Sequence, residues 1–230
     1  VDKYFQMAQC FRDEDLRSSR QPEFTQIDIE MSFSYREDLF AVVEHITKEV
    51  FKDTIGVEIP TPFRHLSYAD AMDKYGTDKP DLRFKMKLVN ISDIAARSSF
   101  QVFKDQVDSG GIVKGLCVKG GAEISRKGID EYTKFVGRFG VRGLAWMKMT
   151  EKGLTSNIVK FFDETLQEEL ADAMDAEVGD IIFLVAEQRD VTNQALDHLR
   201  RRIAADRGLI DPNDYAFAWV TDFPLFEWDE

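Results

Sequence analysis

Alternating apolar and polar positions open the chain and predict two extended segments. In residues 4–12 the apolar set is Phe5, Met7 and Phe11, and the set on the other side of an extended chain is Gln6, Ala8, Cys10 and Arg12. In residues 25–31 the apolar set is Thr25, Ile27, Ile29 and Met31, opposite Gln26, Asp28 and Glu30. A period of two is that of a β-strand, so both segments are predicted to be strands.

The residues between these strands, 13–22, are rich in charged side chains and too poor in apolar ones to form a core. We therefore expect a loop that joins two antiparallel partners. A sheet with one wetted face gives the same alternation, so the pattern alone does not establish a binding site.

A helical period of apolar positions follows. Ser34 and Glu37 have the spacing of a capping box, and the apolar positions Leu39, Val42, Val43, Ile46 and Val50 come after them. A second, shorter helix is predicted to begin at Ser67 and to end at Gly76.

Residues 86–212 alternate between segments with the apolar period of a strand and segments with the apolar period of a helix. Strands are predicted at 112–118, 144–149 and 180–186, and helices at 125–140, 158–174 and 190–208. We interpret this region as a compact α+β module with helices on one side of a sheet. A last strand at 216–220 has the apolar character expected of a return to the first sheet. The chain is thus divided into residues 1–85, 86–212 and 213–230.

Composition indicates an ordinary globular protein, because 43% of the 230 residues are hydrophobic and 31% are charged. No apolar run approaches the ~20 residues that span a bilayer, and no leader opens the chain, so we expect a cytoplasmic protein without a membrane partner. The net charge of −12 argues against a protein that coats DNA or RNA nonspecifically. A local basic patch that reads one RNA remains compatible with it.

Other reactive residues give weaker signals. Cys10 and Cys117 lack disulfide density and metal-ligand spacing, so we expect buried, reduced thiols. The three histidines form no zinc cluster or catalytic triad, and His45 and His198 are predicted to be surface or packing residues on helices. Trp146 and Trp228 are also predicted to pack. Two basic segments, Arg126 with Lys127 and residues 200–202, either touch RNA or form a solvated face, and we favour the solvated face.

The first strand pair carries side chains suited to one kind of chemistry. A guanidinium such as that of Arg12 grips a phosphate with two parallel hydrogen bonds. The ring of Phe24 offers a flat surface for a purine, and Gln26 and Asp28 present groups that hold an ammonium. On one rigid sheet, these groups suit in-line attack of a carboxylate on an α-phosphorus.

Read in order, residues 10–30 resemble motif 2 of the class II aminoacyl-tRNA synthetases, in the form found in the bacterial aspartyl-tRNA synthetase family. Residues 75–83 (YGTDKPDLR) resemble a bacterial-type signature that precedes an extra domain in that family. Residues 120–132 (GGAEISRKGIDEY) resemble the most recognisable part of the extra domain, and residues 222–227 resemble the return strand. The resemblance covers essentially the whole chain.

The resemblance implies an α+β fold: part of a class II antiparallel sheet flanked by helices, with residues 86–212 as an inserted two-layer α+β domain. It implies an aspartate–tRNA ligase that forms aspartyl-adenylate from aspartate and ATP and transfers aspartate to tRNA(Asp), in a homodimer. It also implies Mg²⁺, whose ligands we do not expect in this chain. The family's other catalytic motifs and its anticodon-binding domain are expected before Val1 and after Glu230, so this chain alone is predicted to be inactive.

Residue roles also follow from the resemblance. Arg12 is the expected catalytic residue, contacting the α-phosphate of ATP and the carboxylate of aspartate. The ATP-binding set is Arg12, Asp13, Glu14, Gln21 and Phe24. The aspartate-binding set is Arg12, Gln26 and Asp28. Arg17 and Arg20 are expected near the acceptor end of tRNA, or as solvated charges facing Asp13 and Asp15.

Two alternatives stay open at this point. One is a neighbouring class II enzyme, either an asparaginyl- or lysyl-tRNA synthetase or an asparagine-forming ligase, that shares the motif and acts on another substrate. The other is a noncatalytic binding module that retains the sheet.

Overall fold

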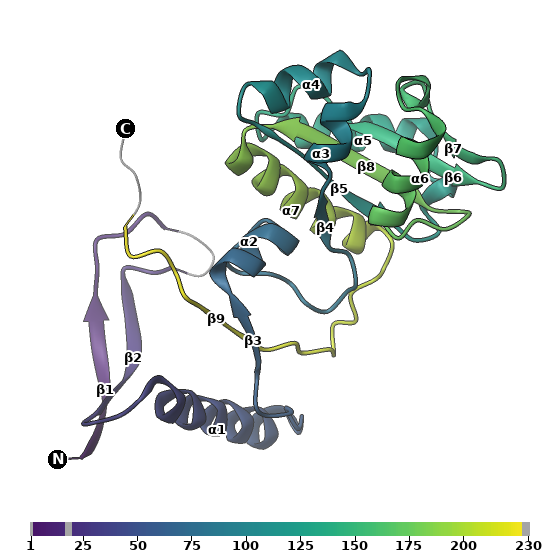
Figure 1. Ribbon diagram of the computed structural model, residues 1–230. Helices are drawn as coiled ribbons and strands as arrows, with labels where there is room; N and C mark the ends of the chain where they lie inside the picture. The colour runs from purple at the N-terminus through teal and green to yellow at the C-terminus, as the bar shows by residue number, and fades with distance from the viewer. Residues whose placement is uncertain (1, 17–19, 227–230) are drawn as a thin grey trace. The chain divides into compact units, whose positions relative to one another are not determined.

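A computed structural model describes residues 2–16 and 20–226 of the chain. It divides the chain into two compact units, Val1–Phe63 and Arg64–Glu230 (Figure 1). In the part of the chain that the structure describes, no helix combines the length and the apolar character needed to cross a membrane.

The first unit is a hairpin followed by a helix. Strands β1 (Lys3–Phe11) and β2 (Glu23–Met31) pair antiparallel along their whole length, which confirms the predicted strand pair. Helix α1 spans Arg36–Ile55. Its capping box lies one residue later than predicted, since the backbone N–H of Tyr35 donates to Asp38 Oδ2 at 2.8 Å. The Ser34 hydroxyl instead donates to the carbonyl of Met31, which fixes the preceding turn.

The hairpin does not bury its apolar face within the described residues. Phe5, Met7, Phe11 and Ile27 are each more than half exposed. An isolated two-stranded hairpin is only marginally stable in water. The strand pair therefore has the surface of a sheet that is incomplete within these residues.

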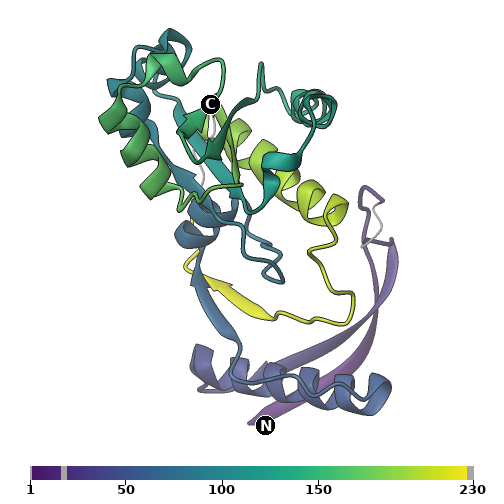
Figure 2. The ribbon, with the colours of Figure 1, turned by 90° about the vertical axis from the view of Figure 1, so that its right-hand side faces the viewer.

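The second unit begins with a strand and a short helix. Strand β3 (Arg64–Ser67) pairs in parallel with β9 (Ala218–Thr221), and Figure 2 shows the two side by side. Helix α2 (Tyr68–Tyr75) begins and ends as predicted, because the Ser67 hydroxyl accepts a hydrogen bond from the Asp70 N–H at 3.0 Å and Gly76 adopts a φ of 75°. The return strand, however, precedes residues 222–227: Asp222, with a φ of 61°, ends it, and Glu227 lies outside the described residues.

An antiparallel five-stranded sheet forms the centre of the second unit, in the order β4-β5-β8-β6-β7. The strands are β4 (Leu88–Asn90), β5 (Ile112–Val118), β6 (Ala145–Thr150), β7 (Gly153–Thr155) and β8 (Ile181–Glu187). The three strands predicted from the sequence for this region are thereby confirmed, and β4 and β7 were not predicted.

Helices cover both faces of this sheet (Figure 1). They are α3 (Ser92–Arg97), α4 (Gln101–Asp108), α5 (Arg126–Gly137), α6 (Glu164–Ala173) and α7 (Arg189–Asp206). One apolar cluster joins α5 and α7 to the sheet and a second joins α3, α4 and α6 to its other face. The α+β class is confirmed, whereas the two-layer arrangement is wrong: β8 is buried on both faces, which requires three layers.

The helix predicted at 158–174 is divided in two. A 3₁₀ turn covers Val159–Phe161, and α6 begins only at Glu164. Asp163 separates them because its carboxylate accepts a hydrogen bond from the N–H of Leu166 at 2.9 Å and so acts as an N-cap.

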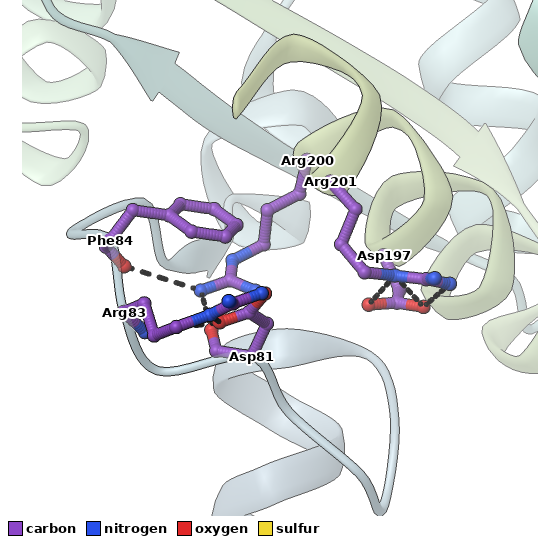
Figure 3. Close-up of polar contacts among 6 residues, drawn as sticks. All are labelled: Asp81, Arg83, Phe84, Asp197, Arg200 and Arg201. Carbon is purple, nitrogen blue, oxygen red and sulfur yellow. Dashed lines mark hydrogen bonds and ion pairs between the residues drawn. The ribbon is translucent and has the colours of Figure 1, made fainter. Parts of the chain in front are cut away.

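The basic run at 200–202 is not a uniformly solvated face. Arg200 is fully buried, and its Nη2 donates to the carbonyls of Asp81 at 2.6 Å and Phe84 at 3.4 Å (Figure 3). Its Nε donates to the carbonyl of Met86, and its guanidinium carbon lies 4.1 Å from the centroid of the Phe84 ring. The prediction of a wet face is therefore wrong for Arg200, while Arg202 is half exposed and pairs with Asp206 at 2.9 Å.

The cysteine and histidine predictions are largely confirmed. Both cysteines are free, but they are only half-buried. Burial raises the pKa of Cys117 to about 12, so its thiol stays protonated at neutral pH. His198 stacks on Phe139 with ring centroids 4.2 Å apart, and burial lowers its pKa. Trp146 packs against the core, and Trp228 lies outside the described residues.

Gly76 is expected to be intolerant of a side chain. A Cβ there would lie 2.3 Å from the carbonyl oxygen of Asn193, and the φ of 75° already disfavours alanine. Gly208 has a φ of 62° with nothing within 4 Å, so it provides a matched control. We expect Gly208→Ala to cost about 1–2 kcal/mol through backbone strain, and Gly76→Ala to cost clearly more in urea unfolding. Equal costs for the two variants would contradict the close approach of α2 to α7.

Candidate active site

The register of the β1–β2 hairpin determines which side chains share a face. Cys10 lies opposite Phe24, Ala8 opposite Gln26, and Gln6 opposite Asp28. Residues directly opposite each other in an antiparallel pair point to the same side. The N–H of Arg12 donates to the carbonyl of Pro22 at 2.9 Å and continues the pairing past Phe11. Arg12, Phe24, Gln26 and Asp28 therefore lie along one face, as the sequence predicted.

The guanidinium of Arg12 is positioned by an aromatic ring. Its central carbon lies 5.1 Å from the centroid of the Phe24 ring, within cation–π range. No carboxylate of the described residues forms an ion pair with Arg12. The side chain is thus held by a neutral partner while its hydrogen-bond donors remain open to an anion.

Two polar side chains of β2 are held by their neighbours on β1. The Gln6 amide donates to Asp28 Oδ2 at 3.1 Å, and the Cys10 thiol donates to Gln26 Oε1 at 3.6 Å. A carboxylate has about four acceptor sites, so Asp28 retains capacity for an ammonium group. Sequence reasoning gave Gln6 and Cys10 no role. Their place on the polar face was the available signal, but their partners follow only from the register.

The loop between the strands contains an ion pair that was not predicted. Arg20 Nη1 lies 3.0 Å from Glu14 Oε2, whereas the alternative reading of Arg20 as a solvated charge had it facing Asp13 and Asp15. The two side chains are 52% and 24% exposed, and such pairs contribute only about 0–1 kcal/mol. A ligand is therefore able to displace either partner at small cost. Asp13 and Gln21 are exposed, and Arg17 lies outside the described residues.

The polar face carries different side-chain chemistry at its two ends. From the row of Arg12 to the row of Gln6 and Asp28 the hairpin extends roughly 20 Å at ~3.4 Å per residue. Along that length it presents a cation and a ring at one end and an amide and a carboxylate at the other. This order suits an anion, a flat base and an ammonium.

Metal-ligating side chains do not cluster in the described part of the chain. Among residues 2–16 and 20–226, no three His, Cys, Asp or Glu side chains come together as a metal-ligand group. Where the Mg²⁺ implied by the resemblance is held stays a prediction, because Mg²⁺ is commonly bound by one or two carboxylates together with substrate phosphates.

Comparison with known proteins gives relatives along the whole chain. The profile of the family described as "tRNA synthetases class II (D, K and N)" matches residues 1–229. The chain is 61% identical over its full length to the aspartate–tRNA(Asp/Asn) ligase of Protochlamydia amoebophila and 53% identical to that of Chlamydia pneumoniae. It is 52% identical over its full length to the aspartate–tRNA ligase of Macrococcus caseolyticus. The chain spans only 38–39% of the length of these relatives.

Proposed function

The chain belongs to the class II tRNA synthetases (D, K and N), and from this premise we propose that it forms the ATP- and aspartate-holding part of an aspartate–tRNA ligase. The observation that carries the proposal is the single face shared by Arg12, Phe24, Gln26 and Asp28. Relatives named as aspartate–tRNA ligases over the whole chain support the choice of amino acid.

Each residue of the face has a role in this proposal. Arg12 contacts the α-phosphate of ATP and the carboxylate of aspartate, and Phe24 stacks on the adenine. Asp13, Glu14 and Gln21 contact ATP from the loop, Glu14 after releasing Arg20. Gln26 and Asp28 hold the ammonium of aspartate, and Arg17 and Arg20 lie near the acceptor end of tRNA.

The whole protein would catalyse two steps. A carboxylate oxygen of aspartate attacks the α-phosphorus of ATP, and pyrophosphate leaves. The adenylate then transfers aspartate to the terminal ribose of tRNA(Asp). We further propose that the whole protein is a cytoplasmic homodimer and that Mg²⁺ neutralises the phosphates with ligands outside this chain.

We propose that residues 86–212 are a domain inserted between 1–85 and 213–230, two parts of one catalytic domain. The pairing of β3 with β9 supports this division, since these strands flank the five-stranded sheet in sequence.

Residues 1–230 alone are expected to show no aspartate-dependent exchange of pyrophosphate into ATP. The chain spans about 38% of the length of its relatives, and the apolar face of its hairpin is uncovered. The measurement is radiolabelled pyrophosphate exchange with and without aspartate. Turnover by this segment would show that the remaining parts of the protein are dispensable for adenylate formation.

The same assay on the full-length protein separates the alternatives. Exchange that depends on aspartate, and not on asparagine or lysine, would favour the proposed substrate over those of neighbouring class II enzymes. Charging of tRNA(Asp) and tRNA(Asn) would then be compared, because the relatives' names include both. A noncatalytic module would show no pyrophosphate exchange. Calorimetry would then show whether it still binds ATP.

A further inference from the structure

A hollow of about 450 Å³ in the second unit is lined by an unusual excess of cations. Arg64, Lys85, Lys87 and Lys119 line it, with Asp175 as the single carboxylate in the lining. The whole chain has the opposite balance, with 42 acidic against 30 basic residues. The hollow is thus a local positive patch on an acidic protein.

Three of these cations lack the partners that the fourth one has. Lys119 lies within 3.5 Å of a carboxylate oxygen of each of Asp175, Glu177 and Asp180, so its charge is already compensated. The three others, Arg64, Lys85 and Lys87, are exposed and have no ion pair with any carboxylate of the described residues. An anion that enters the hollow therefore meets uncompensated positive charge.

The backbone on either side of Lys85 is held by the buried Arg200. Phe84, Met86 and Leu88 point into the core, so the alternation directs Lys85 and Lys87 to the other side. Arg200 donates to the carbonyl of Phe84 (Figure 3) and to that of Met86, and these two residues flank Lys85. A backbone fixed in this way reduces the conformational entropy that is lost when the lysines bind a ligand.

The lining is suited to phosphates rather than to bases. Its aromatic rings, Tyr75 and Phe84, are 3% and 7% exposed, so neither offers a face on which a base would stack. Lysine and arginine side chains neutralise backbone phosphates without reading sequence. We propose that this hollow binds the phosphodiester backbone of RNA through Arg64, Lys85 and Lys87, an inference that rests on the proposed function for its choice of RNA.

The test compares three double variants of the full-length protein in tRNA(Asp) binding. Lys85→Ala with Lys87→Ala is expected to weaken binding about 10-fold or more at moderate salt and to make the slope of log K against log salt concentration shallower by about 2, roughly one unit per lysine. Lys134→Ala with Lys152→Ala removes the same charge from exposed sites outside the hollow, and its affinity should stay within about twofold of wild type. Lys85→Arg with Lys87→Arg should bind like the unmodified protein.

Pyrophosphate exchange, measured on the same proteins without RNA, separates the two proposals. If the unmodified protein shows no aspartate-dependent exchange, the proposed function fails. If exchange is normal and the alanine pair binds tRNA with unchanged affinity and salt slope, the RNA site is refuted. Calorimetry with inorganic phosphate on the unmodified protein and on the Lys85→Ala, Lys87→Ala variant provides a further test. If the variant loses phosphate binding but still binds tRNA like the unmodified protein, the hollow is a site for a free anion and the proposal is overturned.

Discussion

Replacing Arg12 by alanine is expected to lower aspartate-dependent pyrophosphate exchange of the full-length protein by at least about 10²-fold, the loss typical of one preorganised charge contact. The guanidinium lies on the polar face of the hairpin, supported by the Phe24 ring at 5.1 Å. In the proposed reaction it touches both the phosphate that is attacked and the carboxylate that attacks. Its removal should therefore lower kcat for exchange and also raise the KM for aspartate.

Arg36→Ala is the matched control for this variant. Arg36 belongs to the same unit, and its side chain is 52% exposed at the start of α1, outside the two strands that carry the polar face. Both variants should retain the thermal stability of the unmodified protein, because neither side chain is buried. An Arg12→Ala enzyme that exchanges pyrophosphate at a near-normal rate would remove this residue from the chemistry.

The elements that the sequence predicted well are those whose local signals agree. Strand β5 has apolar residues at five of its seven positions and is followed closely by Gly120 and Gly121, and α2 has a serine cap at one end and Gly76 at the other. In the hairpin, the polar alternation and the apolar alternation indicate the same two strands. Where the capping residue, the apolar periodicity and the terminating glycine indicate the same element, few alternative structures remain.

The features that were missed depend on contacts between distant segments. Strand β3 is four residues long and pairs with β9 at the far end of the chain, which no local pattern indicates. Helices α3 and α4 have six and eight residues, too short to establish a helical period, and without them the second layer of helices was not predicted. The three-layer arrangement therefore became visible only in the packing.

The same distinction applies to the candidate site and to the basic run. The polar face was predictable because it depends on the period of a strand. The pairing of Glu14 with Arg20 was not, since it depends on the path of a loop. Likewise, three consecutive arginines on a helix point in different directions, and the sequence does not say that Arg200 is the one that points inward.

Arg200→Met should destabilise the second unit by about 3–5 kcal/mol. Burial lowers the pKa of Arg200 to about 10, so the guanidinium remains charged at neutral pH and forms charge-assisted hydrogen bonds. The methionine would leave the carbonyls of Asp81, Phe84 and Met86 without these donors, and it would remove the cation from the Phe84 ring. The measurement is hydrogen exchange of the amides in β5 and β8, whose protection reports the free energy of opening.

Arg202→Met provides the comparison because it removes the same side chain two positions along the same helix. Arg202 is 54% exposed and pairs with Asp206 across one helical turn, a contact that contributes about 0.3–0.5 kcal/mol. The protection of β5 and β8 should therefore change little in this variant. The amides of residues 81–88 should lose protection first in Arg200→Met, since that segment is what the guanidinium holds. If the amides of residues 81–88 were equally protected in Arg200→Met and Arg202→Met, apolar packing alone would be what keeps this segment in place.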